Sequence, residues 1–283
     1  MYEDFEFPFK DLKMDDKVAF ELERALSLAV KRCLQRYDKC AVAFSGGLDS
    51  SVIAKLLKDL SVDFTAYVVG LNGSEDIAVA KRIADEMGIK LKVAIIKPEE
   101  IESLVRAVIW ITKNNDPVTV GVAMVLYAAA REAAKDGYKI IFSGSGSDEI
   151  FAGYDSHAKA LLQGWFEVHK ECIQRVHNGI NKDIARDVSI CRNFNIDPVM
   201  PFLDIDVVRL AMIIHPRLKI APDQKKLVLR KVAKQLNLPQ EVCERKKRAA
   251  QYGSGVDKAL RKMAKKAGFK TISEYISSVS KVL

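Results

Sequence analysis

The sequence predicts an α/β fold, a parallel sheet with flanking helices, followed by a mostly helical C-terminal half. Two observations lead to this prediction. Short β-like runs alternate with helix-like apolar patterns in the first half, and after Asp155 helical patterns broken by prolines take over. With 283 residues and 49% hydrophobic content, the chain can bury a sizeable core. We expect a helical lead-in (1–38), an α/β core (39–155) and a helical part that completes the same unit (156–283).

The expected elements follow one another regularly. Apolar residues spaced three and four apart predict an amphipathic helix from Val18 to Leu34. Four short β-like runs, separated by helical patterns, then follow at Cys40–Phe44, Phe64–Val69, Leu91–Ile96 and Tyr138–Phe142. Ser74 can cap a helix that Gly88 ends, and Pro98 suits the first turn of the next helix. Such alternation is typical of parallel strands covered by helices on both faces.

Composition excludes several classes of protein. The five cysteines are odd in number and widely spaced, so neither a disulfide framework nor a CxxC site is indicated. No run of 18 apolar residues and no signal-peptide pattern occurs, so we expect a cytoplasmic protein that does not contact a membrane. The net charge is +8, and between Arg217 and Lys270 basic residues outnumber acidic ones roughly four to one. That region should attract anions, which makes RNA a candidate partner.

The stretch FSGGLDSS, from Phe44 to Ser51, follows the first strand and leads into a helix expected from Ser51 to Leu60. Open α/β sheets bind ligands at this position. Gly46 and Gly47 allow a tight turn, while serine hydroxyls and the free N–H groups of the helix start can donate to phosphate oxygens. A Walker A loop would carry lysine, but this loop carries Asp49, which suits magnesium. The alternative is a plain strand-to-helix turn with ordinary serine caps.

A second loop, FSGSGSDEIFAGY from Phe142 to Tyr154, follows the fourth strand. If strands one and four are neighbours, as in the order 3-2-1-4, both loops open onto the same crevice. Asp49 and Asp148 could then share one magnesium ion, since two carboxylates without a cation would repel each other. The alternative for Asp148 and Glu149 is an acidic first turn that stabilises a helix dipole.

These two loops resemble those of the N-type ATP pyrophosphatases. Three further stretches narrow the resemblance to the synthetase domain of asparagine synthetase and its relative β-lactam synthetase: MPFLDIDVVRLAMIIHP (200–216), KKLVLRKVA (225–233) and LPQEVCERKKRAAQYGSG (238–255). Together the motifs run in family order from Val18 to about Arg261. The resemblance implies an adenine nucleotide alpha hydrolase-like (HUP) sheet, with an ATP-pyrophosphatase core at 39–155.

The resemblance also implies a two-step reaction. A substrate carboxylate attacks the α-phosphorus of ATP and magnesium pyrophosphate leaves, after which an amine attacks the acyl-adenylate to give an amide and AMP. Carried onto this chain, it assigns the pyrophosphate to Ser45, Gly46, Gly47, Asp49, Ser50 and Ser51. It assigns the magnesium ion to Asp49 and Asp148, so Asp49 serves both binding and catalysis.

The resemblance also assigns residues to adenosine binding and to the neutralisation of phosphate charge. The residues implied to lie against adenosine are Val68, Val69, Ser143 and Gly144. Because the phosphate loop lacks a lysine, Lys247 is implied to neutralise the transition state and the leaving pyrophosphate, by alignment of RKK with the family's RxK; Lys226 is the second candidate. The alternative for the other members of the ERKKR run is a solvated basic surface or a nucleic-acid patch.

The sequence departs from the family at three places. Residues 1–37 are too few for the family's glutaminase domain, so we expect free ammonia, a separate glutaminase subunit or another amine as the donor. Ser145 replaces the glutamate of the family's SGEGSDE, which is proposed to deprotonate the amine; a serine needs a base beside it to do so at neutral pH. Before PFLD, Asp197 remains, but Val199 occupies the arginine position. The departures concern amidation and leave adenylation intact.

Three functions follow from these patterns. The leading one is an asparagine-synthetase-like ligase that uses ATP and Mg²⁺ to adenylate a carboxylate, which we cannot name, and passes it to ammonia or another amine. The alternative is a tRNA-modifying PP-loop ATPase, since tRNA lysidine synthetases and thiolases share the SGGxDS loop, although the CxxC motif common in thiolases is absent. The third is a nucleotide-binding partner subunit, which would not need Asp49, Asp148 and Lys247 together.

Overall fold

A five-stranded parallel sheet organises the protein. The computed structural model describes residues 15–245 and 249–282. The strands are β1 (Lys39–Ala43), β2 (Asp63–Gly70), β3 (Leu91–Ile95), β4 (Ile140–Phe142) and β5 (Asp197–Val199). Their order is β3-β2-β1-β4-β5, and every neighbouring pair is parallel. The expected order 3-2-1-4 is confirmed, so the loops after β1 and β4 lie next to each other.

The fifth strand is absent from the sequence-based prediction. Among the residues that the structure describes, β5 pairs with β4 alone. The N–H of Asp197 donates to Lys139 O, and the N–H of Ser143 donates to Val199 O, each at 2.9 Å. Pro198, between these two residues, has no N–H, which is tolerated because β5 is an edge strand. A three-residue run that contains a proline gives no strand signal, and for that reason the sequence analysis missed it.

Helices cover both faces of the sheet because side chains alternate along each strand. Cys40 and Val42 of β1 face one apolar layer, whereas Ala41 faces the other. The first layer contains α1 (Asp15–Leu34), α2 (Leu48–Asp59), α3 (Glu75–Met87), α10 (Ile205–Ile213), α11 (Leu227–Gln235) and α12 (Gln240–Glu244). The second contains α4 (Ile101–Thr112), α5 (Pro117–Lys135), α9 (Ala185–Arg192), α14 (Val256–Lys266) and α15 (Ile272–Ser280). The prediction of a parallel sheet with flanking helices is therefore confirmed.

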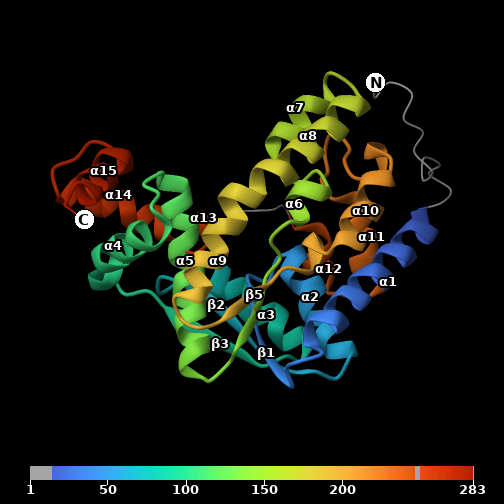
Figure 1. Ribbon diagram of the computed structural model, residues 1–283, viewed down its shortest axis with the longest axis horizontal. Coiled ribbons are helices and arrows are strands. Elements are labelled where there is room, and N and C mark those ends of the chain that lie inside the picture. The colour runs from blue at the N-terminus through green and yellow to red at the C-terminus, as the bar shows by residue number, and fades with distance from the viewer. Residues whose placement is uncertain (1–14, 246–248, 283) are drawn as a thin grey trace.

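The two layers separate clearly in Figure 1, where α1 runs beside α11 at one side and α15 lies beside α4 at the other. The remaining elements connect these layers and border the carboxyl edge of the sheet. They are η2 (Pro98–Glu100), α6 (Ser147–Ile150), α7 (Asp155–Leu161), α8 (Trp165–Gly179), η3 (Ile180–Ile184), η4 (Pro201–Leu203), η5 (Pro216–Leu218) and α13 (Ala250–Gly253). Within the described ranges, no helix is both long and apolar enough to span a bilayer.

Helix ends agree with the sequence signals in most places. Gly88 ends α3 in the left-handed conformation, and Asp116 caps α5 by accepting the N–H of Thr119 at 2.9 Å. The helix after the first loop begins at Leu48 rather than Ser51, because Gly47 already adopts the extended conformation of a cap residue. The second half of FSGGLDSS is therefore the first turn of α2, not loop.

A lysine is buried beside a small third apolar cluster between α8 and η5. Lys219 is fully buried, and its Nζ makes no hydrogen bond to any described residue. Burial lowers its pKa below the ordinary value of 10.5, and the nearby Cys172 opposes the shift only in part. His169 lies on α8, on the same side of that helix as Cys172, and burial also lowers its pKa, to about 4. The cluster thus contains an ionisable group that folding makes harder to charge.

We predict that Lys219→Met stabilises the protein by about 2 kcal/mol near neutral pH, because methionine fills similar volume without a buried ammonium. The unfolded chain binds more protons than the folded one, so the stability of the wild type should rise as the pH rises toward 10.5. The gain from the variant should shrink over the same range. Urea unfolding of both proteins at about pH 7 and about pH 9.5 measures this; a variant less stable than the wild type at both would contradict it.

Candidate functional site

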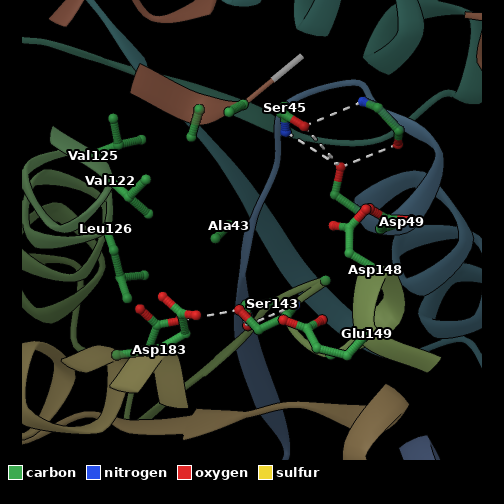
Figure 2. A pocket seen from close by; sticks show the side chains of 18 of the residues that line it. Ala43, Ser45, Asp49, Val122, Val125, Leu126, Ser143, Asp148, Glu149 and Asp183 are labelled. Atoms are coloured by element: carbon green, nitrogen blue, oxygen red, sulfur yellow. Dashed lines mark hydrogen bonds between the residues drawn. The ribbon is translucent and has the colours of Figure 1, made fainter. Parts of the chain in front are cut away.

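A cleft of about 680 Å³ opens at the carboxyl edge of β1 and β4. Its walls come from the two loops after these strands, from α5, from the segment that joins α8 to α9, and from the start of α11. Figure 2 shows the acidic side chains Asp49, Asp148 and Glu149 on one wall and the apolar side chains of α5 on the facing wall. The cleft therefore has one polar side and one apolar side.

The first loop presents its serines to the cleft. Ser45, Gly47, Asp49 and Ser50 line it. Ser45 Oγ accepts the N–H of Gly47 at 3.3 Å, while Ser50 Oγ donates to Gly47 O and accepts the N–H of Ser45, both at 3.3 Å. These bonds stabilise a tight turn at the start of α2, where free N–H groups and the helix dipole favour an anion.

Two residues of the predicted phosphate loop do not line the cleft. Gly46 packs against α3, where a Cβ on it would lie 3.1 Å from the Cα of Ala80. Ser51 is fully buried under the loop, and its Oγ has no hydrogen-bond partner among the described residues. The structure therefore brings four of the six predicted residues to the cleft surface and places Gly46 and Ser51 behind it.

Two glycines of the second loop allow close packing: Gly144 lets it approach the first loop, and Gly153 leaves room for Asp148 and Lys226. A Cβ on Gly144 would lie 2.7 Å from the Cβ of Asp49, closer than real Cβ atoms come. A Cβ on Gly153 would lie 1.9 Å from Asp148 Oδ1 and 2.5 Å from Lys226 Cε. The loops pack with no room for a side chain at either position, and this brings the carboxylates of Asp49 and Asp148 to one point.

A buried ammonium joins these two carboxylates. Lys226 Nζ lies 2.7 Å from both carboxylate oxygens of Asp49 and 2.8 Å from Asp148 Oδ1, and it donates to Ser147 Oγ at 2.7 Å. Its side chain is 4% exposed. Burial acts to lower the pKa of Lys226, but the charges of Asp148 and Asp49 outweigh it, so the net shift is upward and the ammonium stays charged. The loop that lacks a lysine thus receives one from α11.

The same two carboxylates are the candidate magnesium ligands. Among the residues that the structure describes, no three histidine, cysteine, aspartate or glutamate side chains converge as a metal site. Magnesium usually takes one or two protein carboxylates and completes its shell with waters and substrate phosphates. Asp49 and Asp148, beside the turn at the start of α2, fit an ion that arrives with a polyphosphate, and do not fit a permanent all-protein site.

The apolar side of the cleft faces the residues predicted to contact adenosine. The predicted residues Val68, Val69, Ser143 and Gly144 all line the cleft. The helix α5 contributes Val122, Val125 and Leu126 to the wall that faces Asp49 and Asp148 (Figure 2). Sequence reasoning missed this second wall because an apolar stripe on a helix indicates core packing. The available signal was Asp116, which caps the start of α5 and itself lines the cleft.

The chain that follows α8, made of η3 and the first turn of α9, supplies a charged wall that the sequence analysis also missed. Arg186 donates from Nε to Asp187 Oδ1 and from Nη1 to Asp183 Oδ1, each at 2.7 Å. Ser145 Oγ donates to Asp187 Oδ2 at 2.9 Å. Asp187 is 4% exposed, and burial raises its pKa although Arg186 and Ser145 work against the shift. Asp183 belongs to the π-helical turn η3, which directly precedes Arg186 and Asp187 in α9, and such turns are frequent at functional sites.

Lys247 lies outside the described residues. Arg245 and Ala249, on either side of 246–248, both line the cleft. Arg230 binds the backbone of residues 243–245: its Nη1 donates to Cys243 O at 2.6 Å, and its Nη2 donates to Arg245 O at 3.0 Å. The assignment of Lys247 therefore stays a prediction from the sequence.

A parallel sheet of this order, with an SGGxDS loop after its first strand, defines the PP-loop class of ATP-using proteins. The family model described as asparagine synthase matches residues 21–169 and 155–275. The chain therefore belongs to the asparagine synthase family.

Individual relatives agree with this membership. The chain is 33% identical over 295 aligned residues to the "Putative asparagine synthetase (glutamine-hydrolyzing) 1" of Methanocaldococcus jannaschii, covering 92% of this chain and 54% of that protein. It is 29% identical over 252 residues to asparagine synthetase B of Escherichia coli, covering 83% and 45%. Among solved structures, it is similar to NMN synthetase from Francisella tularensis (13% identity, 94% and 93% coverage, TM-score 0.47). The chain spans about half the length of these curated relatives.

We predict that Lys226→Met destabilises the protein by about 3 kcal/mol in buffer without divalent cations, because it leaves two carboxylates facing each other without a cation. Added MgCl₂ should restore part of the loss by binding between them, so the melting temperature of the variant should rise with magnesium more than that of the wild type. Thermal unfolding with and without magnesium measures both effects.

The neighbouring lysine provides the matched control. Lys225 pairs with the exposed Asp155, and such a surface pair contributes at most about 1 kcal/mol. Lys225→Met should therefore melt close to the wild type and show no added response to magnesium. Equal magnesium responses in the two variants would rule out Asp49 and Asp148 as the ion's ligands.

Proposed function

We propose that the protein is an ATP-dependent ligase that activates a carboxylate as its adenylate, releases pyrophosphate, and passes the acyl group to ammonia or another amine with release of AMP. The observation that carries this proposal is that the carboxylates of Asp49 and Asp148 meet at the buried ammonium of Lys226. The glycine- and serine-rich turn at the start of α2 and the apolar side chains of α5 line the same cleft. Family membership supports the proposal.

The two sides of the cleft suggest how ATP lies in it. The adenine ring fits between the valines at the end of β2 and the apolar side chains of α5. The phosphates then reach the first loop, where Ser45, Ser50 and the N–H groups at the start of α2 donate to their oxygens. In this arrangement the α-phosphorus lies over the carboxyl edge of the sheet, open to the α8–α9 wall.

Charge neutralisation comes from three sources. Asp49 and Asp148 would hold a magnesium ion together with the phosphates, and the ion supplies positive charge for the leaving pyrophosphate. Lys226, already charged between the two carboxylates, keeps them from repelling the phosphates. Lys247 is the further candidate for the charge that develops in the transition state.

The charged side chains of the cleft indicate which kind of carboxylate substrate it can hold. Arg175, Lys182 and Arg186 line it, so the cleft can attract an anionic substrate, although Arg175 already pairs with Glu171 and Arg186 with Asp183 and Asp187. The relatives are named asparagine synthetases, which makes L-aspartate the first carboxylate to test. Ammonia, a separate glutaminase subunit and other amines are the candidate nitrogen sources.

The test is exchange of labelled pyrophosphate into ATP, measured with a panel of carboxylates that includes L-aspartate, and in parallel with bulk tRNA. We expect exchange that depends on a carboxylate and on magnesium, and that is lost in Asp49→Asn, since one oxygen ligand and its charge disappear. Exchange that depends on tRNA alone would instead identify an RNA-modifying enzyme, and no exchange with any substrate would exclude adenylation.

We predict that Lys247→Ala lowers the rate of pyrophosphate exchange about 100-fold or more with little change in ATP affinity, because its charge is used in the transition state and not in the ground state. Measuring exchange rates and nucleotide binding separately distinguishes the two effects. Lys246→Ala, one residue away in the same basic run, is the control. If both variants lose the same small fraction of the exchange rate, Lys247 has no special role in the transition state and is an ordinary surface lysine.

A further inference from the structure

The second loop carries a serine where amide formation needs a base. Once the amine has added to the acyl-adenylate, its nitrogen must lose a proton, and a serine hydroxyl cannot take it up alone at neutral pH. Ser145 does not stand alone, because its Oγ donates a hydrogen bond to Asp187 Oδ2 at 2.9 Å across 42 residues of sequence. Both residues line the cleft. This inference rests on the proposed function.

We propose that Asp187 is the proton acceptor of the amide-forming step and acts through the hydroxyl of Ser145. The nitrogen lone pair forms the bond to the acyl carbon, the bond from that carbon to the phosphate oxygen breaks, and AMP leaves with its electron pair. The nitrogen's proton passes to Ser145 Oγ as the hydroxyl proton passes to Asp187 Oδ2. Ser145 ends the step unchanged, and Asp187 ends it as a neutral acid.

The hydrogen bonds around Asp187 suit this role. Arg186 occupies the other carboxylate oxygen, Oδ1, which leaves Oδ2 to Ser145. The charges of Arg186 and Asp183 affect the pKa of Asp187, and the charge of Asp187 in turn affects the pKa of Cys191. Burial and Asp183 raise the pKa of Asp187 against the effects of Arg186 and Ser145, and the net shift is upward. A carboxylate with a raised pKa is a stronger base than an ordinary one.

Other carboxylates of the cleft are engaged differently. Asp148 contacts the buried ammonium of α11. Glu149 accepts a hydrogen bond from Tyr154 Oη at 2.7 Å, and Asp116 caps α5, a contact that helps to lower its pKa. Tyr154 also lines the cleft, so a hydroxyl partner there is not peculiar to Asp187. Asp187 differs in that its partner is Ser145, the residue at the position of the missing base, and in having a raised pKa.

The experiment separates the two half-reactions. Carboxylate-dependent pyrophosphate exchange reports adenylation, and hydroxamate formation with hydroxylamine as the amine reports acyl transfer. We expect Asp187→Asn and Ser145→Ala each to leave exchange within about twofold of the wild type and to lower hydroxamate formation about 100-fold. Ser145→Ala keeps the pair between Arg186 and Asp187 intact, so a folding defect in Asp187→Asn cannot explain a loss that both variants share.

A matched control and a rescue exclude a purely structural role. Asp257→Asn removes a carboxylate paired with an arginine, Arg261, at 2.8 Å but outside the cleft, and should leave both activities unchanged. Adding Ser145→Glu to Asp187→Asn supplies a carboxylate directly and should restore hydroxamate formation at least tenfold. The ratio of wild-type to Asp187→Asn rates should fall toward one as the pH falls through the pKa of Asp187, because its protonated form accepts no proton.

Two results would overturn the inference, and they are distinguishable. Hydroxamate formation at the wild-type rate in Asp187→Asn, with exchange intact, would remove Asp187 from the reaction and leave the ligase in place. Absence of carboxylate-dependent exchange in the wild type would overturn the proposed function, and this step with it.

Discussion

The ammonium of Lys226 is the interaction on which the geometry of the cleft depends. It hydrogen-bonds to Asp49, 177 residues earlier in the sequence, and to Ser147, 79 residues earlier, so one side chain joins both loops to α11. Without it, two carboxylates would face each other in a partly buried position, where their repulsion is screened poorly. A side chain at Gly144 would collide with Asp49, and one at Gly153 would collide with Asp148 and Lys226, so both glycines leave room for this cation and its partners.

The cleft is built from both halves of the sequence. The sheet contributes the two loops, whose place at neighbouring strand ends follows from the strand order. The helical half contributes Lys226, at the start of α11, and the Arg186–Asp187 pair of α9. Because the two loops come from the sheet while Lys226 and Arg186 come from the helical half, the chemistry that we propose requires the helices to pack against the carboxyl edge of the sheet.

Local patterns predicted what depends on local structure. Strands β1 to β4, the turn at FSGGLDSS and the cap at Gly88 each leave a signal within a few residues, and each is found near its expected place. The position of Lys226 could be proposed only through a resemblance, because its contact with Asp49 spans most of the chain. Asp187 left no signal, since its role follows from burial and from a hydrogen bond to Ser145, neither of which a sequence motif records.

The edge strand β5 bears on how the protein behaves at high concentration. Asp197 and Val199 direct their backbone groups toward β4, so the backbone nitrogen of Pro198 lies on the open side of the sheet. A proline there offers no donor to a strand from another molecule. The proline that hid β5 from sequence analysis therefore also discourages edge-to-edge aggregation.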